Sequence, residues 1–421
     1  MVQFSLGSVS FAPPGLALLP ARLPTPCAVG CILSPLRGWR GSRLPLLLQT
    51  RAIHPIDTGA NPDALSRDTV YNLFPATGHR EFLLPTQSPI SVAVVGVGVF
   101  GRNHARVYKE LEQQGEPVRL LGVVDPDTSR ADEVAREFGC KAFGSVQQLL
   151  TTHSEVQAAS VACPTVHHLS VASELMKTGV DVLIEKPLAG TLAEAEELVA
   201  LAATHKRIAQ VGHLERFNPA VRATVPLLTQ PMFFEVHRLS VFTPRSLDVD
   251  VVLDLMIHDL DIVLAFAKSE VKEVRAVGLP ILSGKVDIAN VRLEFDSGCI
   301  ANFTASRVST ERVRKLRFFQ PRQYVSLDYG RQEVLVFTVG HDTAGTPTVN
   351  PQIGVTKVPV ASEEPLHAEL KSFLRAVRER STPVVPLEDG RRALALALEI
   401  VAAIREHGTK VGLSGMAHAK H

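Results

Sequence analysis

Residues 251 to 266, VVLDLMIHDLDIVLAF, form an almost wholly apolar segment that nevertheless holds three aspartates and a histidine. On an α-helix, Asp254, His258 and Asp261 fall at positions i, i+4 and i+7 and share one narrow stripe. Two interpretations fit this stripe. The polar side chains could pair with one another at the edge of a domain, or the histidine could be a general base with the acids as its orienting partners. The choice depends on what the rest of the chain forms.

A second pattern with chemical meaning, ISVAVVGVGVFGRNHARVYKEL, begins at residue 90. A short apolar run of strand type precedes Gly96, Gly98 and Gly101, and an amphipathic helical segment follows to about residue 112. In a dinucleotide-binding turn, the first glycine permits the tight turn, the second lets the backbone approach the pyrophosphate, and the third packs helix against strand. The free N–H groups at the helix start would then meet the negative charge of the phosphates.

Asp125 closes the next predicted strand, VRLLGVVD, 24 residues after Gly101. An acid at this place accepts hydrogen bonds from both hydroxyls of the adenosine ribose and repels a 2′-phosphate. The sequence therefore predicts NAD as the cofactor, with NADP favoured less, although Arg130 is close enough to leave that second option open. The competing interpretation is a glycine-rich turn in some other α/β protein.

The alternation of strands and helices continues beyond this unit. Residues 156–163 and 180–186 are typical of buried strands, and helices are expected over 166–178 and 193–205. Repeated βα units form a parallel sheet that binds its ligand at the carboxyl ends of the strands. Two of these strand ends carry polar sequences, CPTVHH at 163 and EKPLAG at 185. Either one alone could be an ordinary surface loop, but a lysine before a proline at a strand exit would point into the crevice.

The composition is that of an ordinary globular protein. The 421 residues include 45% hydrophobic and 21% charged residues, and 44 basic against 43 acidic side chains leave a net charge of +1. This balance argues against nucleic acid or an anionic membrane surface as a partner. No apolar run is long enough to span a membrane. The five scattered cysteines indicate a reducing compartment, so we expect a cytoplasmic protein, and no metal site is expected.

The first 89 residues differ from the rest of the chain. They hold 12 of the 28 prolines, and five arginines precede the first acidic residue, Asp57. Prolines interrupt every apolar run, which fits neither a secretory signal nor an amphipathic targeting helix. We therefore interpret 1–89 as a disordered leader or the product of an over-early start codon, with a transit peptide as the less favoured option.

These motifs together resemble the Gfo/Idh/MocA family of oxidoreductases. The segments that carry the resemblance stand in the family's order: GVGVFG, Asp125, CPTVHH, EKPLAG, GHLERFNPA at 212–220 and DLMIHDLD at 254–261. The resemblance covers about residues 90 to 408. Cys163 stands where the family usually has a threonine, a small departure that leaves the assignment intact.

The resemblance implies an α/β architecture in two parts. A Rossmann domain would span 90–212, and an α/β domain with an open, mostly antiparallel sheet would span 213–365 and form the substrate wall. Helices within 366–410 would return to pack on the Rossmann domain. Open faces of such sheets usually pair in this family, so a homodimer or homotetramer is expected.

The second half of the chain agrees with this architecture on its own terms. VDIANVRLEF, the turn Asp296-Ser297-Gly298 and CIANFTASR predict a hairpin. RKLRFFQ, RQYVSLDY and QEVLVFTV are typical of further strands. LHAELKSFLRAVRER and GRRALALALEIVAAIREHG predict two helices after Pro365.

The resemblance also implies roles for particular residues. The lysine of E-K-P, here Lys186, would lie between nicotinamide and substrate and offer positive charge to the oxygen as it gains alkoxide character. The histidine of D-x-x-x-H, here His258, would take the hydroxyl proton, with Asp254 beside it. On chemical grounds, Asp254 could hydrogen-bond the substrate or hold the imidazole in the right tautomer, and Asp261 could stabilise the imidazolium. The expected cofactor contacts are Gly96, Gly98, Phe100, Gly101, Asp125, Pro164, Thr165, His168, Glu185 and Lys186.

The segment GHLERFNPA offers the clearest indication of the substrate. Arg216 suits a phosphate or carboxylate and Asn218 suits sugar hydroxyls, so both are candidate substrate-binding residues. A capped turn, with Asn218 before Pro219 at a helix start, is the structural alternative and is compatible with that role. The ERFNP form is most similar to family members that act on nucleotide-linked amino sugars such as UDP-N-acetylglucosamine.

The sequence therefore predicts an enzyme that transfers a hydride from a secondary hydroxyl of a sugar, a UDP-amino sugar in the leading interpretation, to NAD. The same chemistry on a free sugar or inositol is the nearest alternative. A non-catalytic dinucleotide sensor is the alternative of another class, and the presence of both Lys186 and His258 argues against it because a sensor needs neither.

Overall fold

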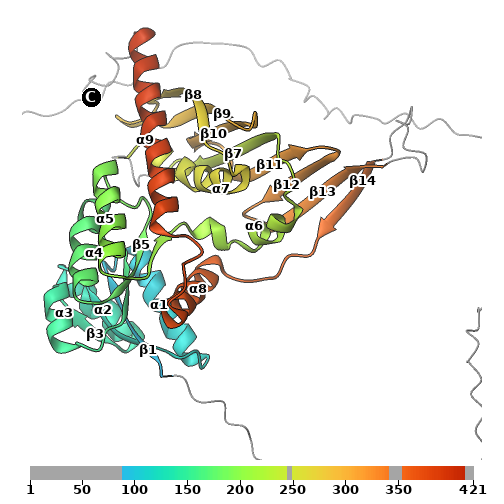
Figure 1. Ribbon diagram of the computed structural model, residues 1–421. Helices are drawn as coiled ribbons and strands as arrows, with labels where there is room; N and C mark the ends of the chain where they lie inside the picture. The colour runs from blue at the N-terminus through green and yellow to red at the C-terminus, as the bar shows by residue number, and fades with distance from the viewer. Residues whose placement is uncertain (1–87, 244–248, 341–352, 413–421) are drawn as a thin grey trace, which may run out of the picture. The chain divides into compact units, whose positions relative to one another are not determined.

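The computed structural model describes residues 88–243, 249–340 and 353–412 (Figure 1). The predicted leader, with Cys27 and Cys31, lies outside the described residues except for its last two positions. Within the described ranges the chain forms two β-sheets, one in each half, with helices packed against them.

The first sheet has six parallel strands in the order β3-β2-β1-β4-β5-β6. Its strands are β1 (Ile90–Val95), β2 (Val118–Val124), β3 (Lys141–Phe143), β4 (Ala158–Val161), β5 (Asp181–Glu185) and β6 (Ala209–Gly212). The connecting helices are α1 (Val99–Gln113), α2 (Thr128–Phe138), α3 (Val146–Thr152), α4 (His168–Lys177) and α5 (Leu192–Thr204). The predicted Rossmann fold is confirmed, and the strand order reverses between β1 and β4, which opens a crevice at their carboxyl ends.

The central strands are apolar because helices cover both faces of this sheet. Every residue of β4 and β5 is buried, and β1 has only Ser91 partly exposed. Local signals fix where the helices begin: Asp127 caps α2, and Thr191 with Glu194 forms a reciprocal capping box at α5. The carboxyl ends of the strands are therefore held in register by a packed core.

The second sheet has eight strands in the order β14-β13-β12-β11-β7-β10-β9-β8. They are β7 (Phe233–Val241), β8 (Val271–Leu279), β9 (Ile288–Phe295), β10 (Ile300–Ser309), β11 (Val313–Gln320), β12 (Gln323–Asp328), β13 (Glu333–Val339) and β14 (Ile353–Val358). β7 and β10 run parallel, and the other neighbouring pairs are antiparallel. The predicted mostly antiparallel sheet is confirmed, as is the hairpin of β9 and β10, whose turn places Gly298 at φ +82°.

The two faces of this sheet have different partners. Alternate residues such as Phe234 and Phe318 are buried in the core that includes α7 (Ile257–Ala267). On the opposite face, Phe319 and Tyr324 stack at 4.8 Å between ring centroids, and Tyr324 stacks on Phe337 at 4.7 Å. Phe319 is 38% exposed, so this aromatic row is open to a partner. The expected dimer or tetramer stays a prediction.

The two C-terminal helices pack differently from each other. α8 (Pro365–Glu379) contacts α1, and its Leu370 and Phe373 are buried in the Rossmann core. α9 (Leu387–Lys410) contacts α5 and β6 near its start, and then α7 and β8 (Figure 1). The expected return to the Rossmann domain therefore describes α8, whereas α9 is shared by both halves. None of the helices in the described ranges combines the length and apolar character needed to cross a membrane.

The glycine loop gives a test of the fold that needs no ligand. A Cβ on Gly101 would lie 1.7 Å from the Gly96 carbonyl oxygen, while one on Gly98 would meet nothing within 4 Å. We expect Gly101→Ala to lower the free energy of unfolding by about 3 kcal/mol because helix and loop must separate. Thermal denaturation of Gly98→Ala, the matched control, should follow that of the wild type. Equal melting temperatures for all three proteins would contradict this packing.

Candidate active site

The glycine loop between β1 and α1 is packed on one side and open on the other. Gly96 has φ +83°, and a Cβ there would lie 2.4 Å from the backbone nitrogen of Cys163. The position of a Cβ on Gly98 is open space. α1 begins beside it with no side-chain cap and no acidic residue in its first turn, so its first N–H groups keep the capacity to bind an anion. The loop therefore fits a pyrophosphate at Gly98.

Asp125 lies just after β2, buried under the glycine loop. One carboxylate oxygen accepts the Val97 N–H at 2.9 Å, and the other accepts the Asp127 N–H at 3.0 Å. Arg130 donates to both oxygens at 3.3 Å, and its side chain remains about half exposed. Asp125 therefore stabilises the glycine loop. It also lies at the strand end where a contact with the adenosine ribose is expected.

A cavity of about 430 Å³ lies along the carboxyl ends of β4 and β5. Its size is within the range of small-molecule sites. Both halves of the chain line it: the Rossmann half contributes Phe100, Pro164, Thr165, His168, Glu185 and Lys186, and the second half contributes Val249, Leu253 and Asp254. The structure thus brings the residues that the sequence singled out at the two strand ends together with Asp254, whereas His258 and Asp261 do not line this cavity.

His168 joins the two loops at these strand ends. It is buried, with Nε2 3.0 Å from the Cys163 carbonyl oxygen and Nδ1 3.1 Å from that of Pro187. Burial lowers the pKa of His168, although the surrounding carbonyls act in the opposite direction. Its ring nitrogens contact backbone carbonyls, so His168 holds the two loops together, and its expected contact with the cofactor stays a prediction.

Lys186 bridges the two halves of the chain. Its Nζ donates to the Asp254 backbone carbonyl at 2.8 Å and lies 3.8 Å from the Asp254 carboxylate. Burial lowers the pKa of Lys186, and the carboxylates of Asp254 and Glu185 act in the opposite direction and favour the ammonium form. A positive charge is thereby held at the wall of the cavity, close to the segment that carries His258.

Glu185 does not present its carboxylate freely to the cavity. Its Oε1 lies 2.9 Å from Nε2 of His104, and the other ring nitrogen of His104 lies 3.0 Å from the Ser160 hydroxyl. Tyr108 also contacts that hydroxyl at 3.0 Å. The sequence analysis did not single out His104. A histidine on the apolar face of the 99–113 helix was the pattern that could have indicated it. Glu185 is therefore a buried support beneath Lys186.

The stripe predicted for Asp254, His258 and Asp261 does not form as expected. The chain makes a π-helical turn, η4 (Val252–Met256), before α7 begins at Ile257. The wider turn breaks the i, i+4 alignment that a regular α-helix would give. Asp254 then meets Lys186 rather than orienting the imidazole, so the expected Asp254–His258 pairing is not observed.

Asp261 is also not a partner of His258. Its carboxylate accepts Nε of Arg216 at 2.6 Å and Nη2 at 2.9 Å. Arg216 reaches Asp389 as well, at 3.2 Å. Asp261 therefore pairs with Arg216 rather than with His258, while Arg216 also lines a cavity and stays a predicted substrate-binding residue.

Asn218 is likewise occupied within the fold. Its Oδ1 accepts the Ala220 N–H at 3.0 Å, which caps α6 (Pro219–Thr224), and its amide donates to Glu215 and to the Tyr329 carbonyl, each at 3.1 Å. The side chain is 3% exposed. The capped-turn interpretation therefore describes Asn218, and the expected sugar contact is not supported.

The charged groups that act most on His258 are cations. Burial is the main cause that holds its pKa well below the usual value, and Lys186 and Arg238 lower it further. The neighbouring Asp259 does not offset this effect, because Arg238 binds it at 2.6 and 2.9 Å. The Nδ1 atom of His258 is buried without a hydrogen-bond partner among the described residues. His258 is therefore a neutral imidazole at neutral pH, the form that accepts a proton.

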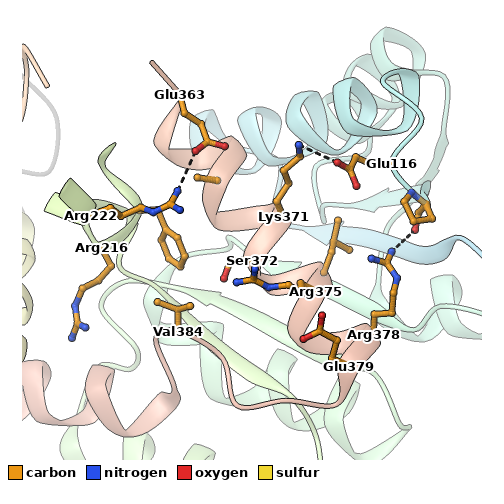
Figure 2. A pocket seen from close by; sticks show the side chains of 14 residues that line it. Glu116, Arg216, Arg222, Glu363, Lys371, Ser372, Arg375, Arg378, Glu379 and Val384 are labelled. Atoms are coloured by element: carbon orange, nitrogen blue, oxygen red, sulfur yellow. Dashed lines mark hydrogen bonds and ion pairs between the residues drawn. The ribbon is translucent and has the colours of Figure 1, made fainter. Parts of the chain in front are cut away.

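A second and larger cavity, of about 490 Å³, lies beside α8 (Figure 2). Cations surround it, but Arg222 pairs with Glu363 at 3.1 Å and Lys371 with Glu116 at 3.0 Å. It shares no lining residue with the cavity beside Lys186. Lys186 and Asp254 line the smaller cavity, whereas Arg216 lines the larger one and His258 lines neither. Across the described ranges, no group of three His, Cys, Asp or Glu side chains is arranged to hold a metal ion.

Comparison with known proteins agrees with this geometry. Residues 90–213 match a model of an oxidoreductase family with an NAD-binding Rossmann fold, and residues 230–323 match the GFO/IDH/MocA C-terminal domain. A UDP-N-acetylglucosamine 3-dehydrogenase from Acidithiobacillus ferrooxidans is 38% identical over 312 residues, which are 74% of this chain and 96% of that protein. A scyllo-inositol 2-dehydrogenase (NAD(+)) from Bacillus subtilis is 28% identical over 52% of this chain and 68% of its own length.

The solved structures give the same result for the fold. One crystal form of the Acidithiobacillus ferrooxidans enzyme has a TM-score of 0.68 at 36% identity, and the match covers 75% of this chain and 97% of that chain. A probable dehydrogenase from Thermotoga maritima, 23% identical, has a TM-score of 0.63 and supports the fold alone. The chain is an oxidoreductase that belongs to the Gfo/Idh/MocA family.

Proposed function

We propose that this protein oxidises a secondary hydroxyl of a UDP-linked amino sugar, UDP-N-acetylglucosamine being the first candidate, with NAD as the hydride acceptor. The observation that carries the proposal is the pairing of Lys186 with Asp254 in a cavity near the open glycine loop. His258, whose pKa is held well below the usual value, follows on the same segment as Asp254. A relative 38% identical over nearly its whole length is named a UDP-N-acetylglucosamine 3-dehydrogenase, which supports the substrate.

Oxidation of a secondary alcohol removes a hydride from carbon and a proton from oxygen. The nicotinamide ring supplies the hydride acceptor when it is bound. Gly98 and the start of α1 would hold the pyrophosphate, and Phe100, Pro164 and Thr165 would line the ring side of the cavity. These residues bind and orient, so the remaining requirement is a group that takes the hydroxyl proton.

His258 is the residue we propose for the proton. A neutral imidazole accepts it without prior ionisation, and the low pKa keeps that form populated. The Lys186 ammonium would stabilise the oxygen as negative charge develops. Asp254 holds Lys186 through its backbone carbonyl, so its role is to orient the lysine. In this proposal His258 takes the hydroxyl proton, and Lys186 stabilises the negative charge that develops on the substrate oxygen.

A free sugar or inositol is the second candidate substrate. The observation in its favour is the likeness to inositol dehydrogenases, one of them 32% identical over 197 residues. That likeness spans 45% of this chain, against 74% for the nucleotide-sugar enzyme. A non-catalytic dinucleotide sensor would not need a lysine and a neutral histidine, so we rank it below both.

The substrate is tested by NADH formation under single-turnover conditions, with the full-length protein in excess over NAD. We expect a burst of NADH fluorescence with UDP-N-acetylglucosamine and none with N-acetylglucosamine or scyllo-inositol, because the nucleotide supplies binding energy that the free sugars lack. Single turnover is used because a keto sugar can be unfavourable at equilibrium. A burst with inositol instead would overturn the nucleotide-sugar assignment while keeping the chemistry.

The base is tested with His258→Asn. We expect turnover to fall about 10²- to 10⁴-fold, the usual contribution of a positioned base, with the Kd for NAD changed less than twofold. The wild-type rate should stay flat as the pH is lowered to 6.5, because the base remains neutral until the pH falls through a pKa well below that value. An acid limb centred near 6.5, or undiminished turnover in the variant, would reject this role.

The cofactor preference is tested with Asp125→Ser. An acid at this place repels a 2′-phosphate, and its removal frees Arg130 to bind one. We expect the ratio of NADP to NAD affinity to rise about tenfold or more in equilibrium titrations. The double variant Asp125→Ser/Arg130→Ala should lose that gain. An unchanged ratio in the single variant would mean that the acid serves only the loop, through Val97 and Asp127.

A further inference from the structure

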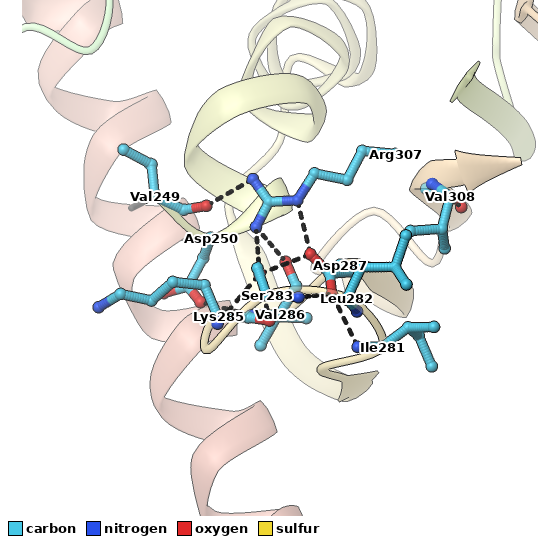
Figure 3. A network of polar contacts seen from close by, with 11 residues as sticks. Val249, Asp250, Ile281, Leu282, Ser283, Lys285, Val286, Asp287, Arg307 and Val308 are labelled. Carbon is cyan, nitrogen blue, oxygen red and sulfur yellow. Dashed lines mark hydrogen bonds and ion pairs between the residues drawn. The ribbon is translucent and has the colours of Figure 1, made fainter. Parts of the chain in front are cut away.

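A buried polar cluster lies where the second sheet meets the segment that leads to Asp254 (Figure 3). It consists of Arg307 on β10, Asp287 and Ser283 before β9, and Val249 with Asp250 ahead of η4, and we call it the Arg307 cluster. Arg307 is 5% exposed and Asp287 is fully buried. The chemistry proposed above leaves this cluster without a role.

Asp287 fixes the loop between β8 and β9. One carboxylate oxygen accepts the N–H groups of Ile281, Leu282 and Ser283 at 2.6 to 2.8 Å. The other accepts the Ser283 hydroxyl at 2.7 Å and Nε of Arg307 at 2.8 Å. Burial opposes the ionisation of Asp287, but these hydrogen bonds outweigh it and hold its pKa well below the usual value. Asp287 is therefore held as a carboxylate opposite the Arg307 guanidinium.

Hydrogen bonds from the cluster hold residues 249 to 251, just before η4. Arg307 donates from Nη1 to the Val249 carbonyl at 2.7 Å. The Val286 N–H donates to the Asp250 carboxylate at 3.0 Å, and the Val251 N–H donates to the Val286 carbonyl at 2.9 Å. Two contacts from Val286 thus seat residues 250 and 251 on the β8–β9 loop, and Arg307 of β10 holds Val249, which lines the cavity.

The segment 249–251 leads directly to Asp254 in the proposed active site. The Asp254 N–H donates to the Asp250 carbonyl at 3.0 Å, and the Asp254 carbonyl accepts Nζ of Lys186 at 2.8 Å. Val249 and Leu253 line the same cavity as Lys186. Hydrogen bonds and the backbone of residues 249 to 254 therefore connect the sheet to the lysine, and Val249, Leu253 and Asp254 of this backbone line the cavity.

We propose that Arg307 is a positioning residue, which sets the place of Val249 to Asp254 over Lys186 and so the substrate wall of the cavity. The planar guanidinium serves Asp287, Ser283 and Val249 at once, which a lysine ammonium cannot do. The catalytic part of this inference rests on the proposed function, whereas the structural part does not.

The test is Arg307→Lys in the full-length protein, because lysine keeps the charge opposite Asp287 but cannot also reach Val249. Arg292→Lys is the matched control, since Arg292 lies exposed on the neighbouring β9 and contacts Asn302. We expect kcat/KM for the sugar to fall about 10- to 100-fold in Arg307→Lys, as misplacement of a binding wall does, with the Kd for NAD within twofold of wild type. Asp287→Asn should give the same pattern and replaces Arg307→Lys if that variant does not fold.

Amide hydrogen exchange supplies a readout that needs no substrate. We expect faster exchange at Val251 and Asp254 in Arg307→Lys, while amides inside β9 and β10 stay protected as in Arg292→Lys. Exchange that rises across the whole sheet, or that matches the control at both amides, would overturn the positioning role. If the wild-type protein oxidised no sugar, the proposed function would fail, and the exchange pattern would still decide the inference.

Discussion

The hydrogen bond from Lys186 to the backbone carbonyl of Asp254 is the contact on which the site depends. It joins the carboxyl end of the Rossmann strand β5 to the π-helical turn η4 of the second half. The first half supplies the ammonium group, and the second half supplies the carbonyl that holds it. The lysine side chain is about 15% exposed, and burial of its charge is tolerated because Glu185 and Asp254 lie close by. Glu185 is itself held by His104, which ties the lysine to the core of the first sheet.

The electrostatics of α7 follow from two arginines that come from other elements. Arg238 of β7 binds Asp259, and Arg216 binds Asp261, so both acids next to His258 are neutralised. Removal of either arginine would leave a buried carboxylate uncompensated, at a cost of about 3–5 kcal/mol. With its acidic neighbours engaged and cations nearby, the imidazole stays neutral, which is the state a base needs before it reacts.

The position of the second domain relative to the lysine depends on several supports. α9 packs on both halves of the chain, and the Arg307 cluster seats the start of the 249–254 segment on the second sheet. The π-helical turn η4 then presents the Asp254 carbonyl to Lys186. Such turns often occur at functional sites, where a regular helix would point the same groups elsewhere.

The sequence by itself determined the Rossmann half, the second sheet and the strand ends where chemistry was expected, because these depend on local patterns: apolar runs, glycine spacing and alternation. It also identified Lys186 and Asp254, which line one cavity, and His258 four residues further along the same segment. It did not determine the partners of the buried charges. Asp261 and Asp259 find arginines 45 and 21 residues away, and Arg216 and Asn218 are used inside the fold. Only the tertiary structure decided these pairings. The desolvation free energy of a buried charge is offset by an opposite charge nearby, and packing determines which opposite charge that is.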